Sequence, residues 1–208
     1  MGKNKIKKAV FLDRDQSQPT NDIRNKAVFL DRDGVINKNI FYPSSNEWES
    51  PRVLEDFKFI DGVFSSLEKL QEKRFLLFIV TNQPSYAKGK TTLRDLKKIL
   101  DFCEKEFAKN NIIITKTYCS FNHPSSIIPK LAMACKYRKP SPGALLEAAK
   151  DFDIDLTKSW MIGDRKTDVE CGKNAGTKTI RIISENNSNS NADFIVANIT
   201  EATKIILT

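Results

Sequence analysis

Long apolar runs are missing from this chain of 208 residues. No stretch approaches the roughly 20 residues that a helix needs to cross a bilayer. No apolar core of signal-peptide length follows the basic N-terminal residues. Cysteine is scarce and scattered, which argues against a secreted disulfide scaffold; the four are Cys103, Cys119, Cys135 and Cys171. We therefore expect a cytoplasmic protein with no membrane partner.

A concentrated basic surface is also missing from most of the chain. The formal net charge is +8, but residues 1–26 hold seven Lys/Arg and three Asp, so half of the excess lies in that segment. Outside it we find no basic stripe interleaved with aromatic residues, the pattern typical of nucleic-acid binding. A small anionic substrate explains the mild positive charge equally well. We expect no nucleic-acid partner and a monomer.

The composition is that of an ordinary globular domain, with 40% hydrophobic and 29% charged residues. One feature is unusual, because the segment AVFLDRD occurs twice, beginning at Ala9 and again at Ala27. Only the second copy continues into a turn glycine and apolar residues, as AVFLDRDGVI. We expect residues 1–25 to be a mobile extension and residues 26–208 to be the folded domain. Pairing of the first copy with a sheet edge is the alternative.

Short, fully apolar runs alternate with helical patterns along residues 26–208. Such runs are typical of strands buried on both faces of a parallel sheet. The expected strands are 27–31, 75–81, 160–164, 179–183 and 193–196, and the expected helices are 63–70, 93–107, 142–152 and 168–175. The pattern predicts an α/β sandwich with a mainly parallel central sheet and helices on both faces. Residues 40–54, 120–138 and 184–191 are expected to be irregular.

Two carboxylates, Asp31 and Asp33, follow the first of these strands directly. Alternation along a strand would place them on the same face, and Gly34 then allows a tight turn. Because close carboxylates repel, a cation would keep both usable. One could attack a phosphorus atom while the other handles a proton. A loop salt bridge with Arg32 is the alternative reading.

Further polar groups follow the other expected strands. Val80-Thr81-Asn82-Gln83 offers a hydroxyl and two amides that suit phosphate oxygens, and Lys139 could neutralise phosphoryl charge. Asp164 and Asp168 suit Mg²⁺. Each has a bland alternative: Thr81 as a cap, Lys139 as surface charge, and Asp168 as an acid in the first turn of a helix. Their common position at strand ends favours one site.

These motifs resemble those of the haloacid dehalogenase (HAD) superfamily of phosphatases. The residues that carry the resemblance are Asp31-x-Asp33-Gly34-Val35, Thr81, Lys139 and Gly163-Asp164-x-x-x-Asp168. More narrowly, FLDRDGVIN, FKFIDGV, VTNQ, RKPSPG and GDRKTD resemble the D-glycero-D-manno-heptose 1,7-bisphosphate phosphatases, with histidinol phosphatases nearby. The resemblance covers about residues 26–208 and implies a HAD-like Rossmannoid fold without a large cap domain.

The resemblance also implies a role for each matching residue. Asp31 would be the nucleophile that forms an aspartyl-phosphate, and Asp33 would be the acid and base. Asp31, the carbonyl of Asp33, and Asp164 would bind Mg²⁺, while Asp168 would orient Lys139. Thr81 and Lys139 would stabilise the transferring phosphoryl group. The sugar phosphate would be contacted by the segment Asn39–Tyr42 and by Asn82, Gln83, Arg138 and Lys139.

Phosphatases of this type commonly carry a zinc loop, and here its pattern is degenerate. His123 lies four residues after Cys119 rather than two, and Tyr137 stands where the cysteine after Cys135 would be. Structural zinc normally has four ligands, and only Cys119, His123 and Cys135 remain as good candidates. We expect the loop to bind no zinc.

The resemblance therefore predicts a Mg²⁺-dependent phosphatase acting on the 7-phosphate of the heptose bisphosphate, in the synthesis of lipopolysaccharide or other surface polysaccharide. Histidinol phosphate is an alternative substrate. A polynucleotide 3′-phosphatase is disfavoured by the charge distribution. A non-catalytic relative is disfavoured because Asp31, Asp33, Lys139 and Asp164 are all present.

Overall fold

The computed structural model describes residues 24–184 and 190–208. Its main feature is a six-stranded parallel sheet with the order β5-β4-β1-β6-β7-β8. The strands are β1 (Lys26–Leu30), β4 (Phe75–Asn82), β5 (Ile114–Ser120), β6 (Trp160–Gly163), β7 (Lys178–Ile182) and β8 (Phe194–Val196). Every residue of β6 is buried and β1 is buried from Ala27 onwards, as a sheet covered on both faces requires.

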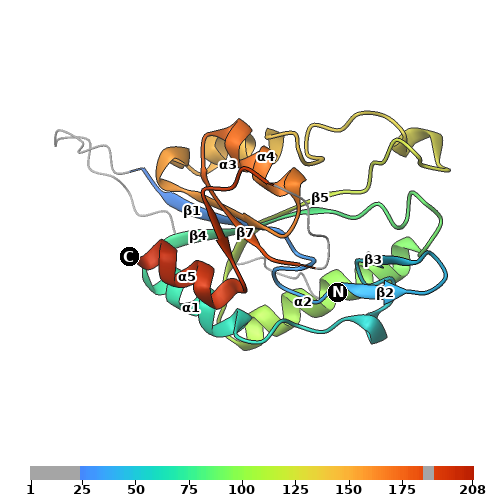
Figure 1. Ribbon diagram of the computed structural model, residues 1–208, viewed down its shortest axis with the longest axis horizontal. Helices are drawn as coiled ribbons and strands as arrows, with labels where there is room; N and C mark the ends of the chain where they lie inside the picture. The colour runs from blue at the N-terminus through green and yellow to red at the C-terminus, as the bar shows by residue number, and fades with distance from the viewer. Residues whose placement is uncertain (1–23, 185–189) are drawn as a thin grey trace, which may run out of the picture.

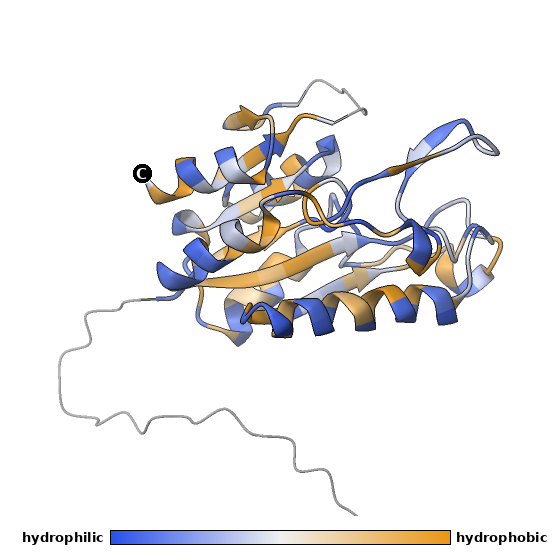
Figure 2. Ribbon diagram, turned by 90° about the horizontal axis from the view of Figure 1, so that it is seen from below, coloured by the Kyte–Doolittle hydropathy of each residue, from blue (hydrophilic) through white to orange (hydrophobic). Residues whose placement is uncertain are grey.

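Helices cover both faces of the sheet (Figure 1). They are α1 (Val63–Glu72), α2 (Leu93–Lys109), α3 (Gly143–Asp151), α4 (Lys166–Ala175) and α5 (Ile199–Leu207). One apolar cluster joins α1, α2 and α5 to Val28, Leu30 and Ile79 of the sheet. A second joins α3 and α4 to Phe29, Phe78 and other residues of the opposite face. Figure 2 shows apolar residues along the central strands between these layers. The predicted sandwich, mainly parallel with helices on both faces, is confirmed.

Three strands and one α-helix were absent from the sequence expectation. Strand β5 was not recognised, because only Tyr118 and Ser120 of its seven residues are buried at this sheet edge. Helix α5 was also missed, although Asn198 caps it by accepting a hydrogen bond from the backbone N–H of Glu201. The stretch 40–54, expected to be irregular, contains the antiparallel hairpin β2 (Ile40–Tyr42) and β3 (Glu47–Glu49).

The remaining regular elements are three short 3₁₀ turns, η1 (Leu54–Asp56), η2 (Pro129–Leu131) and η3 (Leu156–Lys158). Among the described residues, the segments outside the sandwich are the β2–β3 hairpin and connecting loops, so this part of the chain carries no large cap domain. The first AVFLDRD copy lies outside the described residues, so the expectation that it is a mobile extension stays a prediction. The described helices do not include one with the length and apolar character needed to cross a membrane.

Candidate active site

Three neighbouring strands end at the same edge of the sheet and deliver the predicted site residues there. Asp31 follows β1 directly, Thr81 lies near the end of β4, and Asp164 follows β6. Because β4, β1 and β6 are adjacent and parallel, their carboxyl ends meet. The backbone N–H of Asp31 donates to the carbonyl of Ile162 at 2.8 Å, which ties the two acidic segments together.

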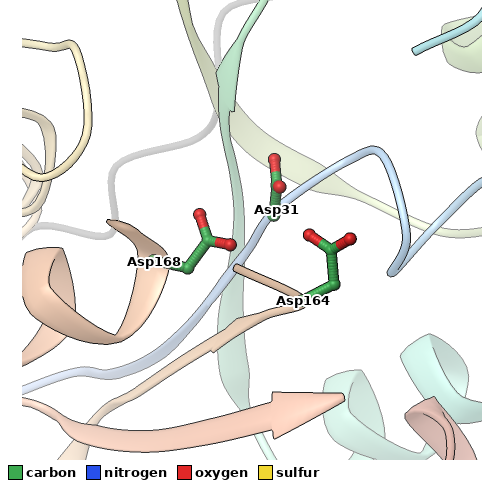
Figure 3. A group of neighbouring side chains, drawn as sticks. All are labelled: Asp31, Asp164 and Asp168. Atoms are coloured by element: carbon green, nitrogen blue, oxygen red, sulfur yellow. The ribbon is translucent and has the colours of Figure 1, made fainter. Parts of the chain in front are cut away.

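A buried cluster of three carboxylates forms at this edge (Figure 3). Asp31, Asp164 and Asp168 each offer an oxygen within 4.8 Å of the others, and in the part of the chain that the structure describes this is the one such group of acids, histidines or cysteines. Their exposed fractions are 6%, 0% and 1%. Asp168 reaches the cluster from the first turn of α4, where its Oδ2 accepts from the backbone N–H of Arg165 at 2.9 Å.

Lys139 lies between the carboxylates. Its Nζ is 2.8 Å from Oδ1 of Asp31 and 2.6 Å from Oδ1 of Asp168, and it donates to the carbonyl of Val80 at 2.7 Å. Asn82 fixes the backbone of this lysine, because its side chain donates to the carbonyl and accepts from the N–H of Lys139, both at 3.1 Å. The amide of Asn82, predicted to contact substrate, therefore positions Lys139.

Asp33 belongs to a second, adjoining network. Arg32 donates to it from Nε and Nη2, at 2.9–3.2 Å, so the salt bridge that was considered as an alternative is present beside the cluster. Asn37 donates to Oδ1 at 2.9 Å and Gln83 donates to Oδ2 at 2.5 Å. The carboxylate of Asp33 is thus held from both sides while it still lines the cavity described below.

Two glycines let these segments approach each other. Gly34 has a φ of +86°, and a Cβ at this position would lie 2.4 Å from Oδ2 of Asp164. A Cβ on Gly163 would lie 2.1 Å from Cβ of Asp168. Any side chain at either position would force the acidic residues apart.

The electrostatics follow from burial and crowding. Burial, together with the carboxylates of Asp168 and Asp164, raises the pKa of Asp31 to about 8, although Lys139 opposes the shift. Burial and Asp168 likewise raise the pKa of Asp164 to about 6. Burial works against the charge of Lys139, but Asp168 and Asp31 outweigh it and raise the pKa of the lysine. When all of these groups are ionised, the three carboxylates therefore carry more negative charge than Lys139 balances.

The residues present fit a divalent cation of the Mg²⁺ type. Among the described residues, Oδ1 of Asp164 is buried and has no hydrogen-bond partner. Oδ1 of Asp31 contacts Lys139 and accepts from the backbone N–H of Arg32. Oxygen ligands of this kind suit Mg²⁺. Both oxygens of Asp168 are already engaged, by Lys139 and by the N–H of Arg165, so Asp31 and Asp164 are the better ligands.

A cavity of about 720 Å³ opens above the carboxylates. Asp31, Asp33 and Lys139 lie in its wall, and residues 46–50 of the β2–β3 hairpin form part of its rim. The hairpin is braced, because Arg52 pairs with Glu49 at 2.9 Å and its guanidinium lies 3.9 Å from the ring centre of Tyr42. Lys90 also pairs with Glu49. Trp48, which packs against Phe41 at 5.6 Å, faces the cavity as one of its lining residues.

The residues predicted to contact the sugar phosphate differ in their positions, since some line this cavity and others bond to neighbouring residues. Arg138 lines it and donates to the carbonyl of Asn122 at 2.6 Å. Asn39 donates to Oδ2 of Asp164 at 3.1 Å, at the carboxylate cluster. The hydroxyl of Tyr42 donates to Asp56 and accepts from the N–H of Arg52, so its polar atom is engaged within the hairpin region. Gln83 is 1% exposed and bonds to other site residues.

The structure does not gather the three candidate zinc ligands into a group of the kind formed by the aspartates. Nδ1 of His123 accepts from the backbone N–H of Ser125 at 3.0 Å. Burial raises the pKa of the Cys119 thiol to about 12, so without metal this cysteine is a neutral thiol. Tyr137 stands where the pattern would have the cysteine after Cys135. Its ring centre lies 5.6 Å from that of Tyr118, and its hydroxyl donates to Glu147.

Several residues of the site were missed by the sequence analysis. Asn37 holds Asp33, and Lys88, Arg165 and Lys166 line the cavity; Arg32, which also holds Asp33, had been considered only as a loop salt bridge. For Arg32, the sequence feature that indicates a role is its position between two acids after a buried strand. Alternation of side chains along a strand would place it on the other face of the sheet. The residues of the cavity rim come from loops, whose path the sequence pattern does not define.

Comparison with known proteins also indicates a HAD-type phosphatase. Residues 136–202 match a family model described as HAD-hydrolase-like. The chain is 37% identical over 163 residues to the D-glycero-alpha-D-manno-heptose-1,7-bisphosphate 7-phosphatase of Campylobacter jejuni, which covers 78% of this chain and 85% of the relative. It is 31% identical over 151 residues to the D-glycero-beta-D-manno-heptose-1,7-bisphosphate 7-phosphatase of Escherichia coli K12, covering 72% and 75%.

Solved structures share the fold. A putative HAD-like phosphatase from Mesorhizobium loti has a TM-score of 0.73 with 22% identity, covering 88% of this chain and 85% of that one. The D,D-heptose 1,7-bisphosphate phosphatase from B. bronchiseptica, solved with magnesium and phosphate, has a TM-score of 0.72 with 20% identity, covering 88% and 98%. These likenesses support the described α/β architecture.

Proposed function

The chain belongs to the HAD superfamily of phosphatases, and we propose that this enzyme removes the 7-phosphate of D-glycero-D-manno-heptose 1,7-bisphosphate with the help of Mg²⁺. Relatives at 30–37% identity carry the name of that activity. The proposal places the enzyme in heptose synthesis for a surface polysaccharide. Relatives of both anomeric types match this chain, so the anomer is a question for experiment.

One observation carries the proposed chemistry. Four buried carboxylates share the site with two buried cations, and the set is Asp31, Asp33, Asp164 and Asp168 with Arg32 and Lys139. These two buried cations leave two negative charges unbalanced when all groups are ionised, and the half-exposed Arg165, 3.9 Å from Oδ1 of Asp164, balances them only in part. A bound divalent cation would balance them, and would itself attract a phosphate group. Asp31 and Asp164 would hold the ion, and when bound it would neutralise charge on the phosphoryl oxygens.

In the first proposed step, an oxygen of Asp31 attacks the phosphorus of the substrate. The bond from phosphorus to the sugar oxygen breaks, and Asp33 gives its proton to that oxygen. The phosphoryl group is then an acyl phosphate on Asp31. Lys139, held 2.8 Å from Asp31, keeps positive charge beside the oxygens that gather negative charge in the transition state.

In the second proposed step, Asp33 takes a proton from a water molecule that attacks the phosphorus. The bond between phosphorus and Asp31 breaks, phosphate leaves, and both carboxyl groups return to their starting states. The buried hydroxyl of Thr81 and the ammonium group of Lys139 serve both steps, because each would meet the same phosphoryl oxygens. No further catalytic group is needed for the two steps to balance.

The cavity suits a substrate with a polar body and a second anionic group. Its volume of about 720 Å³ exceeds what a single phosphate would need. Trp48 offers an apolar face from the hairpin, and Arg138 and Lys88 offer positive charge from other segments of the lining. Lys90 lines the same cavity but is paired with Glu49, so it offers less charge to a ligand.

The proposal is tested by measuring phosphate release with Mg²⁺ from four substrates. These are the two anomers of the heptose bisphosphate, histidinol phosphate and a 3′-phosphorylated oligodeoxynucleotide. We expect the highest kcat/KM for one of the heptose bisphosphates, with loss of activity in EDTA. Preference for histidinol phosphate or the oligonucleotide would contradict the substrate assignment, and activity that is unchanged by EDTA would contradict the metal assignment.

A further inference from the structure

Gln83 lies in the interior of the active site and not on the cavity wall. It follows β4 directly, two residues after Thr81, and its exposed fraction is 1%. Its backbone N–H donates to the carbonyl of Ser120 at 2.7 Å, which continues the pairing of β4 with β5. Because strand geometry places alternate side chains on one face, Gln83 lies beside Thr81.

The side-chain nitrogen of Gln83 makes two contacts at once. Nε2 donates to Oγ1 of Thr81 at 2.8 Å and to Oδ2 of Asp33 at 2.5 Å. The carboxylate of Asp33 accepts hydrogen bonds. If the amide were flipped, its oxygen Oε1, an acceptor, would face the acceptor oxygen Oδ2 of Asp33. In the described part of the chain Oε1 of Gln83 is buried without a partner. The two donor contacts therefore fix the orientation of the amide.

This arrangement prepares both neighbours for catalysis. The amide occupies an acceptor position on Oγ1 of Thr81, which leaves the hydroxyl hydrogen free for a phosphoryl oxygen. It also donates the shorter of two hydrogen bonds to Oδ2 of Asp33, at 2.5 Å against 3.2 Å from Arg32, while Arg32 and Asn37 hold Oδ1. Gln83 thus joins Asp33 to Thr81 through a single amide nitrogen.

We propose that Gln83 is a positioning residue. It holds the acid–base carboxylate of Asp33 at a fixed position relative to the phosphate-binding hydroxyl of Thr81. This role replaces the substrate contact expected from the sequence, and it rests on the function proposed above. Its effect falls mainly on the steps in which Asp33 moves a proton. Those steps are protonation of a poor leaving group and activation of water for hydrolysis of the aspartyl-phosphate.

The test uses Gln83→Met, which keeps the length of the side chain and removes both donors. With p-nitrophenyl phosphate, whose leaving group does not need a proton, the first turnover stays fast and the hydrolysis of the aspartyl-phosphate slows by roughly 10²-fold. We expect a burst of one p-nitrophenol per active site followed by slow release. With an alkyl phosphate, which needs Asp33 in both steps, the whole time course is slow and shows no burst.

Two controls separate positioning from general damage. Gln71→Met makes the same change in α1, where the amide bonds to the backbone of Asn111 and Ile113, and it should keep wild-type kinetics. In an Asp33→Asn background, Gln83→Met should cause less than about a threefold further loss, because residues that act as a unit are not additive. If Gln83→Met does not fold, Gln83→Asn, whose shorter amide cannot span both partners, takes its place.

Equal slowing of the burst and the steady state, or full additivity with Asp33→Asn, would overturn the positioning role. Unchanged kinetics in Gln83→Met would do so as well. Failure of the proposed function would look different, since wild-type turnover would then be absent or would persist in Asp31→Asn.

Discussion

At the scale of single residues, the site combines acids that are costly to bury with one lysine that links them. Lys139 contacts Asp31 and Asp168 at 2.8 and 2.6 Å, and the arginine and amides around Asp33 form a separate set of contacts. The negative charge that Lys139 and Arg32 do not balance remains beside Asp31 and Asp164, the proposed metal ligands. Without the cation, folding must place this charge in a buried site, which lowers stability.

Metal-free protein should therefore lose stability as pH rises from about 4 to about 8. The pKa values of Asp31 and Asp164 are raised to about 8 and about 6 in the folded protein. The folded state then binds more protons than the unfolded state in this window, so unfolding becomes easier as pH rises. Thermal unfolding in EDTA measures the effect, and excess Mg²⁺ should stabilise most near pH 8, where the ligands are ionised.

Asp31→Asn is the matched control for this pH dependence, because it removes the most strongly shifted carboxyl group. Its Tm in EDTA should fall less steeply with pH than that of the wild type. A wild-type Tm that rises across the window, or identical slopes for both proteins, would show that the buried acids do not govern stability there.

Two glycines with nearly the same positive φ allow backbone strain and side-chain crowding to be separated. Gly34 and Gly176 have φ values of +86° and +85°. A Cβ at Gly176 meets nothing within 4 Å, whereas one at Gly34 meets Asp164 at 2.4 Å. Gly176→Ala should cost about 1–2 kcal/mol of unfolding free energy and keep activity. Gly34→Ala should cost more and also weaken Mg²⁺ binding, since it would displace Asp164, which we propose as a metal ligand.

Urea unfolding and Mg²⁺ titration of activity measure both variants. A Gly34→Ala enzyme with wild-type kcat and Mg²⁺ requirement would contradict the close approach of this turn to Asp164.

At the scale of elements, buried strands were easier to predict than the segments around them. The runs that became β1, β4 and β6 are apolar except at their ends, so the sequence predicts interior strands with polar site residues where they end. Edge strand β5 carries Thr115, Lys116 and Thr117 and has few buried residues, and the β2–β3 hairpin is held by side-chain pairs such as Arg52 with Glu49. These depend on tertiary contacts that no local pattern encodes, and the same holds for the partners of Gln83.

The loop between β5 and α3 should hold less than one zinc per chain. Tyr137 takes the place of a thiolate and instead packs against Tyr118 and bonds to Glu147. Elemental analysis of purified protein measures the metal, and Cys119→Ser should keep phosphatase activity. Stoichiometric zinc that disappears in Cys119→Ser would show that the loop still forms a metal site.

At the scale of the whole molecule, the order β4-β1-β6 explains why one site can use one copy of the repeated segment. The copy at 27–33 is followed by Gly34, and its acids meet Thr81 from β4 and Asp164 from β6. The chain has one set of these partners. We therefore expect Asp13→Asn to keep full specific activity, whereas Asp31→Asn should lose at least about three orders of magnitude in kcat.

The central claim is that the carboxylate of Asp31 accepts the phosphoryl group. The most direct measurement is acid quenching of the enzyme during turnover with Mg²⁺ and the heptose bisphosphate, followed by peptide mass analysis. The account predicts one phosphoryl group on the peptide that contains Asp31, absent without Mg²⁺ and absent in Asp31→Asn. A phosphoryl group on Asp13, or rapid phosphate release by Asp31→Asn, would contradict it.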